Sequence, residues 1–357
     1  MTDREDGDER ADPAAPEDPT VDRERPAPGT PDSENSAHRN RGFRRLFGDA
    51  GGDEASAGDP CDRDFTVGLF FPIATDAADP ADPAALDDQL ALAEYAEELG
   101  FDALWVRDVP TYWPKFGDAG QVYDPWVYLG QAAARTDEVA LATGSVVLPL
   151  RHPLHVAKAA ASVDRLSDGR LVLGVGSGDR SPEYAAFGVD EASRGERFRE
   201  HVRVLRRVWA EEFPEVASSY GAMDGSLDPV PKPTTESLPL LVTGHSRQSL
   251  DWIADRGDGW LQYRFPETTL ERVLADWREA AGDKPYAQAM TVELQADPGA
   301  EMAHVHQGFA AGSEWLVDHV RDLADRGVDH LAVGLRGGDR DARAVLAQFA
   351  DEVLDEL

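Results

Sequence analysis

The chain has 357 residues, of which 68 are acidic and 35 are basic, so its formal net charge is −33. This balance excludes non-specific nucleic-acid binding, which needs Lys and Arg against phosphates, and adsorption to anionic membrane surfaces. A single cysteine excludes a disulfide framework, and the lack of a long apolar run excludes a membrane-spanning helix, so we expect a cytoplasmic protein.

Residues 1–60 differ in composition from the rest of the chain. They contain 16 acidic and 8 basic residues, many Pro, Gly and Ser, and few large apolar side chains. Such a segment cannot offset its ordering entropy by burial, so it is predicted to be a disordered acidic tail. The basic and aromatic stretch 41–47 is a candidate docking element, but we favour a solvated tail there as well. Residues 61–357 form the predicted folded domain.

From residue 64 onward, strand-like and helix-like patterns alternate. Strands are predicted at residues 65–71, 103–106, 139–143, 171–175, 240–243, 259–262, 290–294 and 330–333. Helices are predicted at residues 85–99, 125–135, 153–166, 194–209, 248–256, 268–281, 314–325 and 341–354. Eight strand–helix pairs without hairpin signals predict parallel strands and a single (β/α)8 TIM-type barrel, with a doubly wound open sheet as the alternative. Residues 213–238 are rich in Pro and are expected to be irregular.

Only four of the basic residues are lysines, and the rest are arginines. An acidic surface poor in lysine is typical of a protein that works in concentrated salt, where screening removes the self-repulsion of the chain. The sequence therefore predicts a halophilic source, with an ordinary acidic protein as the alternative.

Reacting groups in such a barrel lie at the carboxyl ends of the strands. The fourth predicted strand runs into the glycine-rich loop 174–179, whose free amides could bind an anion. Its spacing resembles a dinucleotide fingerprint, but Pro182 follows and no helix is expected to begin there at once.

A second anion site is predicted after the fifth strand. Gly244 permits a tight turn, and Ser246 and Ser249 would bring hydroxyl groups to the first turn of the next helix, beside its free amides. Ser246 would serve equally well as a plain helix cap without a ligand. The local sequence leaves a phosphate site and a cap as equal alternatives.

Several blocks of the chain resemble the luciferase-like, flavin-dependent monooxygenase superfamily. The clearest run through residues 144–153 (GSVVLPLRHP), 157–170 (AKAAASVDRLSDGR), 173–178 (LGVGSG), 239–246 (PLLVTGHS) and 254–260 (ADRGDGW). Residues 105–110 (WVRDVP) and 120–126 (GQVYDPW) resemble a subgroup of luciferase-type oxidoreductases. The order and spacing of the blocks carry the resemblance, which covers residues 64–350.

The resemblance implies a cofactor, either reduced FMN or a deazaflavin, above the strand ends. The matching positions on the phosphate side are Ser177, Gly178, Tyr184, Gly244, His245, Ser246 and Ser249. Those on the ring side are Asp108, Thr143, Gly144 and Ser145. The resemblance also shifts the choice at Ser246 and Ser249 towards a phosphate site.

The chain departs from the resembled family after the second strand. Asp108 matches an acidic residue of many relatives, but Val109 stands where they carry a histidine, so a general base is missing there. His152 is the nearest imidazole that could replace it, although capping the helix before Pro153 is the favoured role. Asp108 has either a chemical role or a structural one, paired with Arg107 or Arg151.

These observations predict a two-component monooxygenase that uses reduced FMN and oxygen on a small organic substrate. A separate flavin reductase would supply the cofactor. The alternatives are a deazaflavin-dependent hydride transfer on the same barrel and a non-catalytic flavin-binding protein. We expect no metal, because His304 and His306 lack a third ligand at suitable spacing. The alanine-rich helices 124–135 and 153–166 suggest a homodimer.

Overall fold

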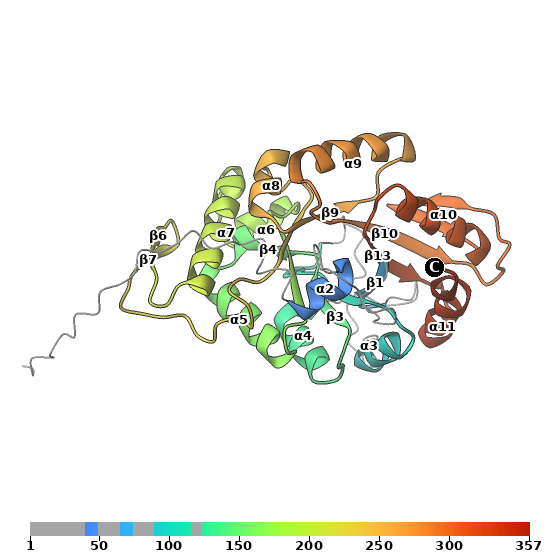
Figure 1. Cartoon of the computed structure of the whole chain (residues 1–357), viewed down its shortest axis with the longest axis horizontal. Coiled ribbons are helices and arrows are strands. Elements are labelled where there is room, and N and C mark those ends of the chain that lie inside the picture. Colours follow the sequence, from blue (N-terminus) through green and yellow to red (C-terminus); the bar gives the residue numbers. More distant parts are fainter. Residues whose placement is uncertain (1–39, 49–64, 74–88, 114, 116–122) are drawn as a thin grey trace, which may run out of the picture. The chain divides into compact units, whose positions relative to one another are not determined.

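The computed structural model describes residues 40–48, 65–73, 89–113, 115 and 123–357. Within these residues, eight parallel strands lie in the order β1, β2, β3, β5, β8, β9, β10 and β13, and β13 pairs back to β1 (Figure 1). The sheet is therefore a closed TIM-type barrel, which confirms the predicted fold class, and the open-sheet alternative is wrong.

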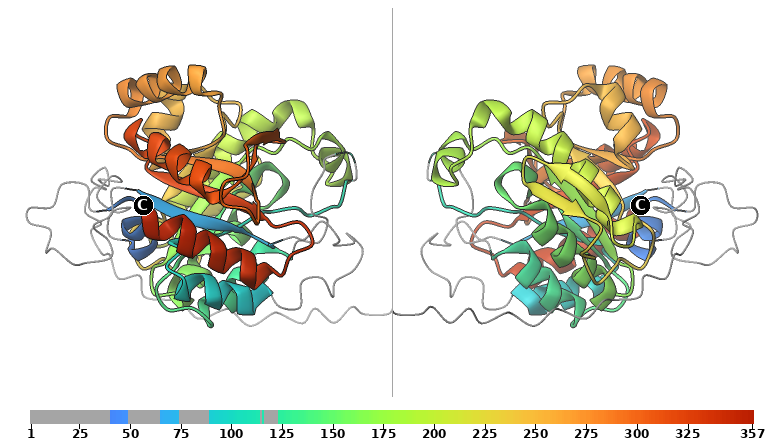
Figure 2. Two further views of the ribbon diagram at one scale, coloured as in Figure 1. Left: turned by 90° about the vertical axis from the view of Figure 1, so that its right-hand side faces the viewer. Right: turned by 90° about the vertical axis from the view of Figure 1, so that its left-hand side faces the viewer.

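The barrel strands are β1 (Thr66–Phe71), β2 (Ala103–Val106), β3 (Ala140–Thr143), β5 (Leu171–Gly176), β8 (Leu240–Thr243), β9 (Gly259–Tyr263), β10 (Tyr286–Leu294) and β13 (His330–Arg336). The helices that follow them are α3 (Gln89–Glu98), α4 (Pro125–Ala133), α5 (Pro153–Leu166), α7 (Arg194–Ala210), α8 (Leu250–Arg256), α9 (Glu267–Ala281), α10 (Ser313–Asp325) and α11 (Ala342–Glu352). In Figure 2 these helices lie outside the strands, with α8 and α9 on one side of the barrel and α3 and α11 on another. Helix α5 and strand β8 have the bounds that the sequence predicts.

Several short elements were not expected. The stretch expected to be irregular contains an antiparallel hairpin of β6 (Glu215–Ser218) and β7 (Gly221–Asp224). A second hairpin of β11 (Ala303–Val305) and β12 (Gly308–Ala311) lies beside β10. Two further short elements are β4 (Val146–Val147) and helix α6 (Ser181–Ala186). Helix α6 begins two residues after Asp179, with Pro182 in its first turn, so the expectation that no helix starts there at once is wrong.

Alternate residues of the barrel strands face opposite sides, as the period of two requires. The outward residues are mostly Leu and Val and pack against the surrounding helices. The inward residues are mostly Ala and Gly, with Trp105 among them.

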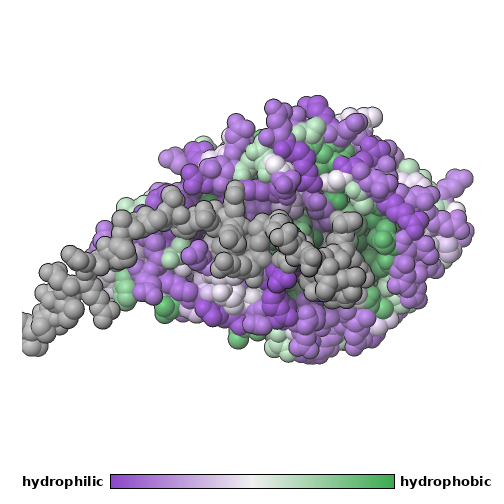
Figure 3. Space-filling view, in the orientation of Figure 1, coloured by the Kyte–Doolittle hydropathy of each residue, from purple (hydrophilic) through white to green (hydrophobic). Residues whose placement is uncertain are grey.

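No helix of the described residues is long and apolar enough to cross a membrane. The face seen in Figure 3 is mostly hydrophilic where it is coloured.

Residues 41–47, which we expected to be solvated tail, form helix α2 (Arg41–Phe47). Asn40 caps the helix by accepting a hydrogen bond from the Phe43 amide, and Phe43 and Leu46 are each only 1% exposed. Their side chains join the cluster inside the barrel. The expectation of a solvated tail is wrong at this stretch. The Asn40 cap and the burial of Phe43 and Leu46 inside the barrel are enough to stabilise this short helix. The rest of residues 1–60 lies outside the described residues.

Candidate functional site

A pocket of about 270 Å³ lies at the carboxyl ends of strands β2, β3, β5 and β8. Seven of the predicted site residues line it: Asp108, Gly144, Ser145, Ser177, Gly178, Gly244 and Ser246. These residues come from four separate parts of the sequence, and the closure of the barrel brings them together.

Glycine forms much of the pocket wall beyond β5. A Cβ atom on Gly176 would lie 2.6 Å from the Ser145 hydroxyl oxygen, and one on Gly178 would lie 2.7 Å from the Tyr184 hydroxyl. Gly178 also has a φ of +80°, which favours glycine. Ser145 and Tyr184 occupy the space beside these two glycines, so the packing of the pocket wall itself requires glycine here.

Ser177 and Ser246 join the ends of β5 and β8. The Ser177 amide donates to the Ser246 hydroxyl oxygen at 3.2 Å, and that hydroxyl donates to the Thr243 carbonyl at 2.8 Å. The Tyr184 hydroxyl donates to the Ser177 carbonyl. Burial raises the pKa of Tyr184 to about 12, so the phenol stays protonated and remains a donor. Tyr184 thus supports the wall from behind and does not line the pocket.

Two threonines occupy different positions at the strand ends. The Thr143 hydroxyl is fully buried and donates to the Gly174 carbonyl at 2.8 Å, and Thr143 does not line the pocket. Thr243 does line the pocket, and its buried hydroxyl has no hydrogen-bond partner among the described residues. A buried hydroxyl without a partner is costly, so Thr243 marks a place for a ligand.

Helix α8 begins later than the phosphate prediction assumed. Ser246 and Arg247 have φ angles of 45° and 62°, and these two left-handed residues turn the chain before the helix starts at Leu250. Ser249 is the cap, accepting a hydrogen bond from the Trp252 amide at 3.3 Å. Ser246 is therefore not on the first turn of the helix and does not cap it.

His245 and Ser249 are exposed and do not line the pocket. The His245 ring instead lies edge-on to Trp260, with ring centroids 5.5 Å apart. Of the side chains assigned to the phosphate, the structure brings together Ser177 and Ser246.

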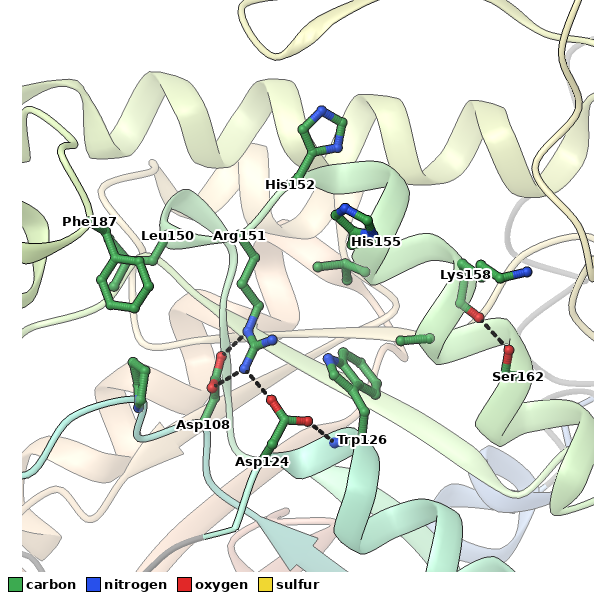
Figure 4. Close-up of a pocket in the computed structure, with 13 residues that line it drawn as sticks. Asp108, Asp124, Trp126, Leu150, Arg151, His152, His155, Lys158, Ser162 and Phe187 are labelled. Carbon is green, nitrogen blue, oxygen red and sulfur yellow. Dashed lines mark hydrogen bonds and ion pairs between the residues drawn. The ribbon is translucent and has the colours of Figure 1, made fainter.

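Asp108 is held by Arg151, as the structural alternative proposed. The Arg151 guanidinium donates to both carboxylate oxygens of Asp108, at 2.7 and 2.6 Å, and also to Asp124 at 3.0 Å (Figure 4). The Val147 amide donates to Asp108 at 3.1 Å. Burial lowers the pKa of Arg151, but the two carboxylates raise it more, so the net pKa is raised and the cation is permanent. Both oxygens of Asp108 accept hydrogen bonds, so Asp108 is placed to hold Arg151 and the Val147 backbone in the pocket wall.

His152 caps helix α5 and points away from Asp108 (Figure 4). Its Nδ1 accepts from the Leu154 amide at 3.2 Å, which leaves the proton on Nε2, 3.2 Å from the Tyr220 carbonyl oxygen. Both ring nitrogens are therefore engaged with the backbone. His152 does not line the pocket at the strand ends, whereas Val109 does.

Four charged residues of the pocket were missed by the sequence analysis: Arg107, Asp179, Arg180 and Glu183. The Glu183 carboxylate accepts a hydrogen bond from the Thr111 hydroxyl at 2.9 Å and lies 3.9 Å from Arg180, and burial raises its pKa. Arg107 was predictable, because it lies two residues after the inward-facing Trp105, directly after the end of strand β2. Arg180 gave no such signal, since the loop before α6 sets its direction.

A larger hollow of about 740 Å³ lies between α4 and α5, on the other side of the Asp108–Arg151 pair. Its lining includes Trp126, His155, Ala159 and Phe187 (Figure 4). Within the described residues, no three His, Cys, Asp or Glu side chains are placed to hold a metal ion.

Comparison with known proteins gives a consistent result. The model of the luciferase-like monooxygenase family matches residues 65–311. An F420-dependent glucose-6-phosphate dehydrogenase of Beutenbergia cavernae is 34% identical over 326 residues, covering 78% of this chain and 95% of that protein. The monooxygenase RslO1 from Streptomyces bottropensis has a TM-score of 0.69 at 23% identity, covering 82% of this chain and 99% of its own. The oxygenating constituent of 3,6-diketocamphane monooxygenase from Pseudomonas putida, solved with FMN, has a TM-score of 0.66 at 17% identity, covering 83% and 99%.

Proposed function

Because the chain belongs to the luciferase-like monooxygenase family, whose members are oxidoreductases, we propose that it uses reduced FMN and molecular oxygen to oxidise a small organic substrate. The proposed cofactor site is the pocket at the strand ends. The observation that carries the proposal is Thr243, which lines this pocket and has a buried hydroxyl without a hydrogen-bond partner among the described residues.

The residues of the pocket suit a flavin nucleotide. Ser177 and Thr243 line the pocket and carry hydroxyl groups, and Arg180 offers a positive charge in a lining that also includes Asp179 and Glu183. Phosphates and flavin rings both take hydrogen bonds from such groups. When bound, the reduced flavin would supply the electrons for the chemistry with oxygen.

The chain's own residues would orient the cofactor and keep water out. The Asp108–Arg151 pair fixes the short strand β4 through the Val147 amide, and Val147 lines the same pocket. Phe70 closes the barrel below Gly144, and the Arg107 guanidinium lies 5.7 Å from the centre of its ring. Residues that hold a bound cofactor against the barrel in this way would limit the access of water to it.

Hydride transfer with a deazaflavin is the second candidate. The 34% identity to an F420-dependent dehydrogenase favours it. Val109 also favours it, because no imidazole stands at the position that supplies one in many relatives. The two candidates need different cofactors, so cofactor identity separates them.

Cofactor binding in concentrated salt tests the proposal. The purified protein is titrated with FMN, reduced FMN and F420, and retained cofactor is identified by absorbance and mass. The proposal expects binding of FMN with oxygen consumption when a reductase supplies reduced FMN. Selective binding of F420 would replace the proposal by the second candidate. Binding of FMN without any turnover would support a flavin carrier, and no binding of either cofactor would contradict both enzymes.

We also propose a homodimer, although most alanines of helices α4 and α5 cannot form its interface. Most of the alanines in question, including Ala132, Ala133, Ala157, Ala160 and Ala161, are buried inside the single chain. The exposed apolar side chains of this region are Val127 on α4, Leu166 on α5 and Phe187 beside the hollow. Light scattering in concentrated salt should give about twice the 38.8 kDa chain mass, and a monomer would contradict the dimer.

A further inference from the structure

Alanine occupies many inward positions of the barrel strands. TIM-barrel interiors are normally filled by bulky branched residues, but six inward positions here are alanine: Ala103, Ala140, Ala142, Ala287, Ala289 and Ala332. The larger side chains of the interior are Trp105, Val172, Leu241 and Leu261 from the strands and Phe43 and Leu46, which enter from helix α2. The interior is therefore complete only with residues 40–47, which we call the plug.

A directed chain of hydrogen bonds runs from the plug to Trp105. An indole N–H only donates, so Trp105 Nε1 donates to His330 Nε2 at 2.9 Å. The proton of His330 must then lie on Nδ1, which donates to the Thr66 hydroxyl oxygen at 2.8 Å. The Thr66 hydroxyl donates in turn to the Leu46 carbonyl at 2.8 Å. Loss of the plug would leave a buried donor without its acceptor.

The opposite edge of Trp105 lies beneath the candidate cofactor pocket. A Cβ atom on Gly144 would lie 3.3 Å from Cε3 of Trp105 and 2.8 Å from the Phe70 ring. The Phe70 and Trp105 ring centroids are 6.0 Å apart. Gly144 lines the pocket and lies against the Trp105 ring. A shift of Trp105 would therefore move the backbone that forms the floor of the pocket.

The plug lies outside the part of the chain that the family model matches, which begins at residue 65. It is nevertheless attached closely to the barrel. The Gly42 amide donates to the Gly169 carbonyl at 3.1 Å, and the Asn40 side-chain amide donates to Asp164 at 3.1 Å. A segment added to the family barrel thus contributes to its core.

We propose that seating of the plug at one end of the barrel is coupled to ligand binding at the other end, with Thr66, His330 and Trp105 as positioning residues. The identity of the ligand rests on the proposed function, whereas the coupling from the plug to the pocket floor does not. Coupling between two sites is reciprocal. A seated plug therefore strengthens ligand binding, and a bound ligand protects the plug.

Substitutions in the full chain separate the steps. In Gly42→Val the new side chain meets the Arg170 carbonyl oxygen, because a Cβ atom there would lie 2.2 Å from it, so the plug cannot seat. Arg41→Ala is the matched control on the same helix, since Arg41 is exposed and its ion pairs with Glu138 and Asp168 are exposed as well. Thr66→Val removes the central hydroxyl with the plug present, and Thr66→Ser restores it.

Hydrogen exchange without ligand provides the first measurement. We expect faster amide exchange at residues 140–147 in Gly42→Val and Thr66→Val, with residues 267–281 on the outer layer unchanged. Arg41→Ala and Thr66→Ser should match the wild-type chain. If Gly42→Val does not fold, Thr66→Val alone decides. The proposal would be overturned if Gly42→Val and Thr66→Val, as far as they fold, exchange the amides of residues 140–147 as slowly as the wild type does.

FMN titration provides the second measurement. Weakening of FMN binding by roughly 5- to 150-fold is expected in Gly42→Val and Thr66→Val, which is the usual range of coupling between sites. FMN should also slow exchange at residues 42–48 of the wild-type chain. Equal FMN affinity in the wild type and both variants would overturn the coupling. Failure of the wild type to bind FMN would contradict the proposed function, and the exchange measurement would still decide the plug.

Discussion

Trp105 and His330 meet in the centre of the barrel, where the indole N–H donates to His330 Nε2 at 2.9 Å. His330 must accept this hydrogen bond, so it must be neutral. Burial agrees with this, because it lowers the pKa of His330 to about 3. His201 on α7 is likewise buried, and its pKa is also lowered to about 3 by burial.

These two histidines predict a loss of stability in mild acid. Their pKa values are lower in the folded chain than in the unfolded chain, where histidine titrates near about 6.5. The unfolded chain therefore binds more protons below about pH 6.5, and the free energy of unfolding should fall from there towards about pH 3. Each histidine contributes a slope of up to about 1.4 kcal/mol per pH unit. Urea unfolding of His201→Leu should show a shallower loss than the wild type between about pH 7 and about pH 5, and superimposable pH profiles would contradict this.

The plug predicts that the N-terminal segment is needed for stability. Phe43→Ala removes a ring that is 1% exposed inside the barrel, so we expect a loss of about 3–5 kcal/mol in the free energy of unfolding. A chain beginning at residue 62 should lose at least as much. Arg41→Ala, which removes exposed ion pairs, should cost about 0–1 kcal/mol. A truncated chain that is as stable as the full chain would show that the segment is a dispensable tail.

The ion pair of Asp108 and Arg151 should matter more than exposed pairs do. Arg151→Leu leaves the buried Asp108 carboxylate without its two charged hydrogen bonds, which should cost about 1.5–3 kcal/mol or more. Arg135→Leu is the matched control, because the Arg135–Glu94 pair is largely exposed, and it should cost at most about 1 kcal/mol. The two variants are compared by chemical unfolding, and equal losses would argue against a structural role for Asp108.

Element positions were largely predictable from the sequence, because hydrophobic periodicity reports which face of each element is buried. Helix α5 and strand β2 have the predicted bounds for this reason. Helix α2 was missed because its two anchors, Phe43 and Leu46, lie in a stretch whose average composition is that of a disordered tail. That helix is stabilised by packing against the interior of the barrel. The local sequence pattern of residues 41–47 does not predict this contact.

The site was predictable only in part. The glycines and Ser177 follow from the glycine-rich loop after a barrel strand. Ser246 and Ser249 were misplaced relative to helix α8, because two left-handed residues delay its start. Whether the Thr243 hydroxyl finds a hydrogen-bond partner depends on residues that are distant in the sequence. The residues next to Thr243 in the sequence therefore do not predict that it lacks one.

Salt dependence follows from the net charge of −33. Repulsion among acidic side chains destabilises the folded chain in dilute buffer, and screening relieves it over distances of about 10 Å at 0.1 M salt. The melting temperature should therefore rise steadily from dilute buffer to concentrated KCl. A flat or falling profile would remove the argument for a halophilic source.

If a flavin occupies the pocket at the strand ends, as we propose, two threonine variants should differ in their affinity for it. Thr243→Val removes a pocket hydroxyl that has no partner within the described structure, whereas Thr143→Val removes one that bonds to the Gly174 carbonyl away from the pocket. Calorimetric titration with FMN and thermal unfolding are carried out on both variants and the wild type.

Thr243→Val should keep or slightly raise the melting temperature and weaken FMN binding by about threefold to tenfold, the value of one hydrogen bond. Thr143→Val should lose about 1 kcal/mol of stability and bind FMN like the wild type. Wild-type FMN affinity in Thr243→Val, or weakened affinity in Thr143→Val alone, would contradict the assignment of the pocket.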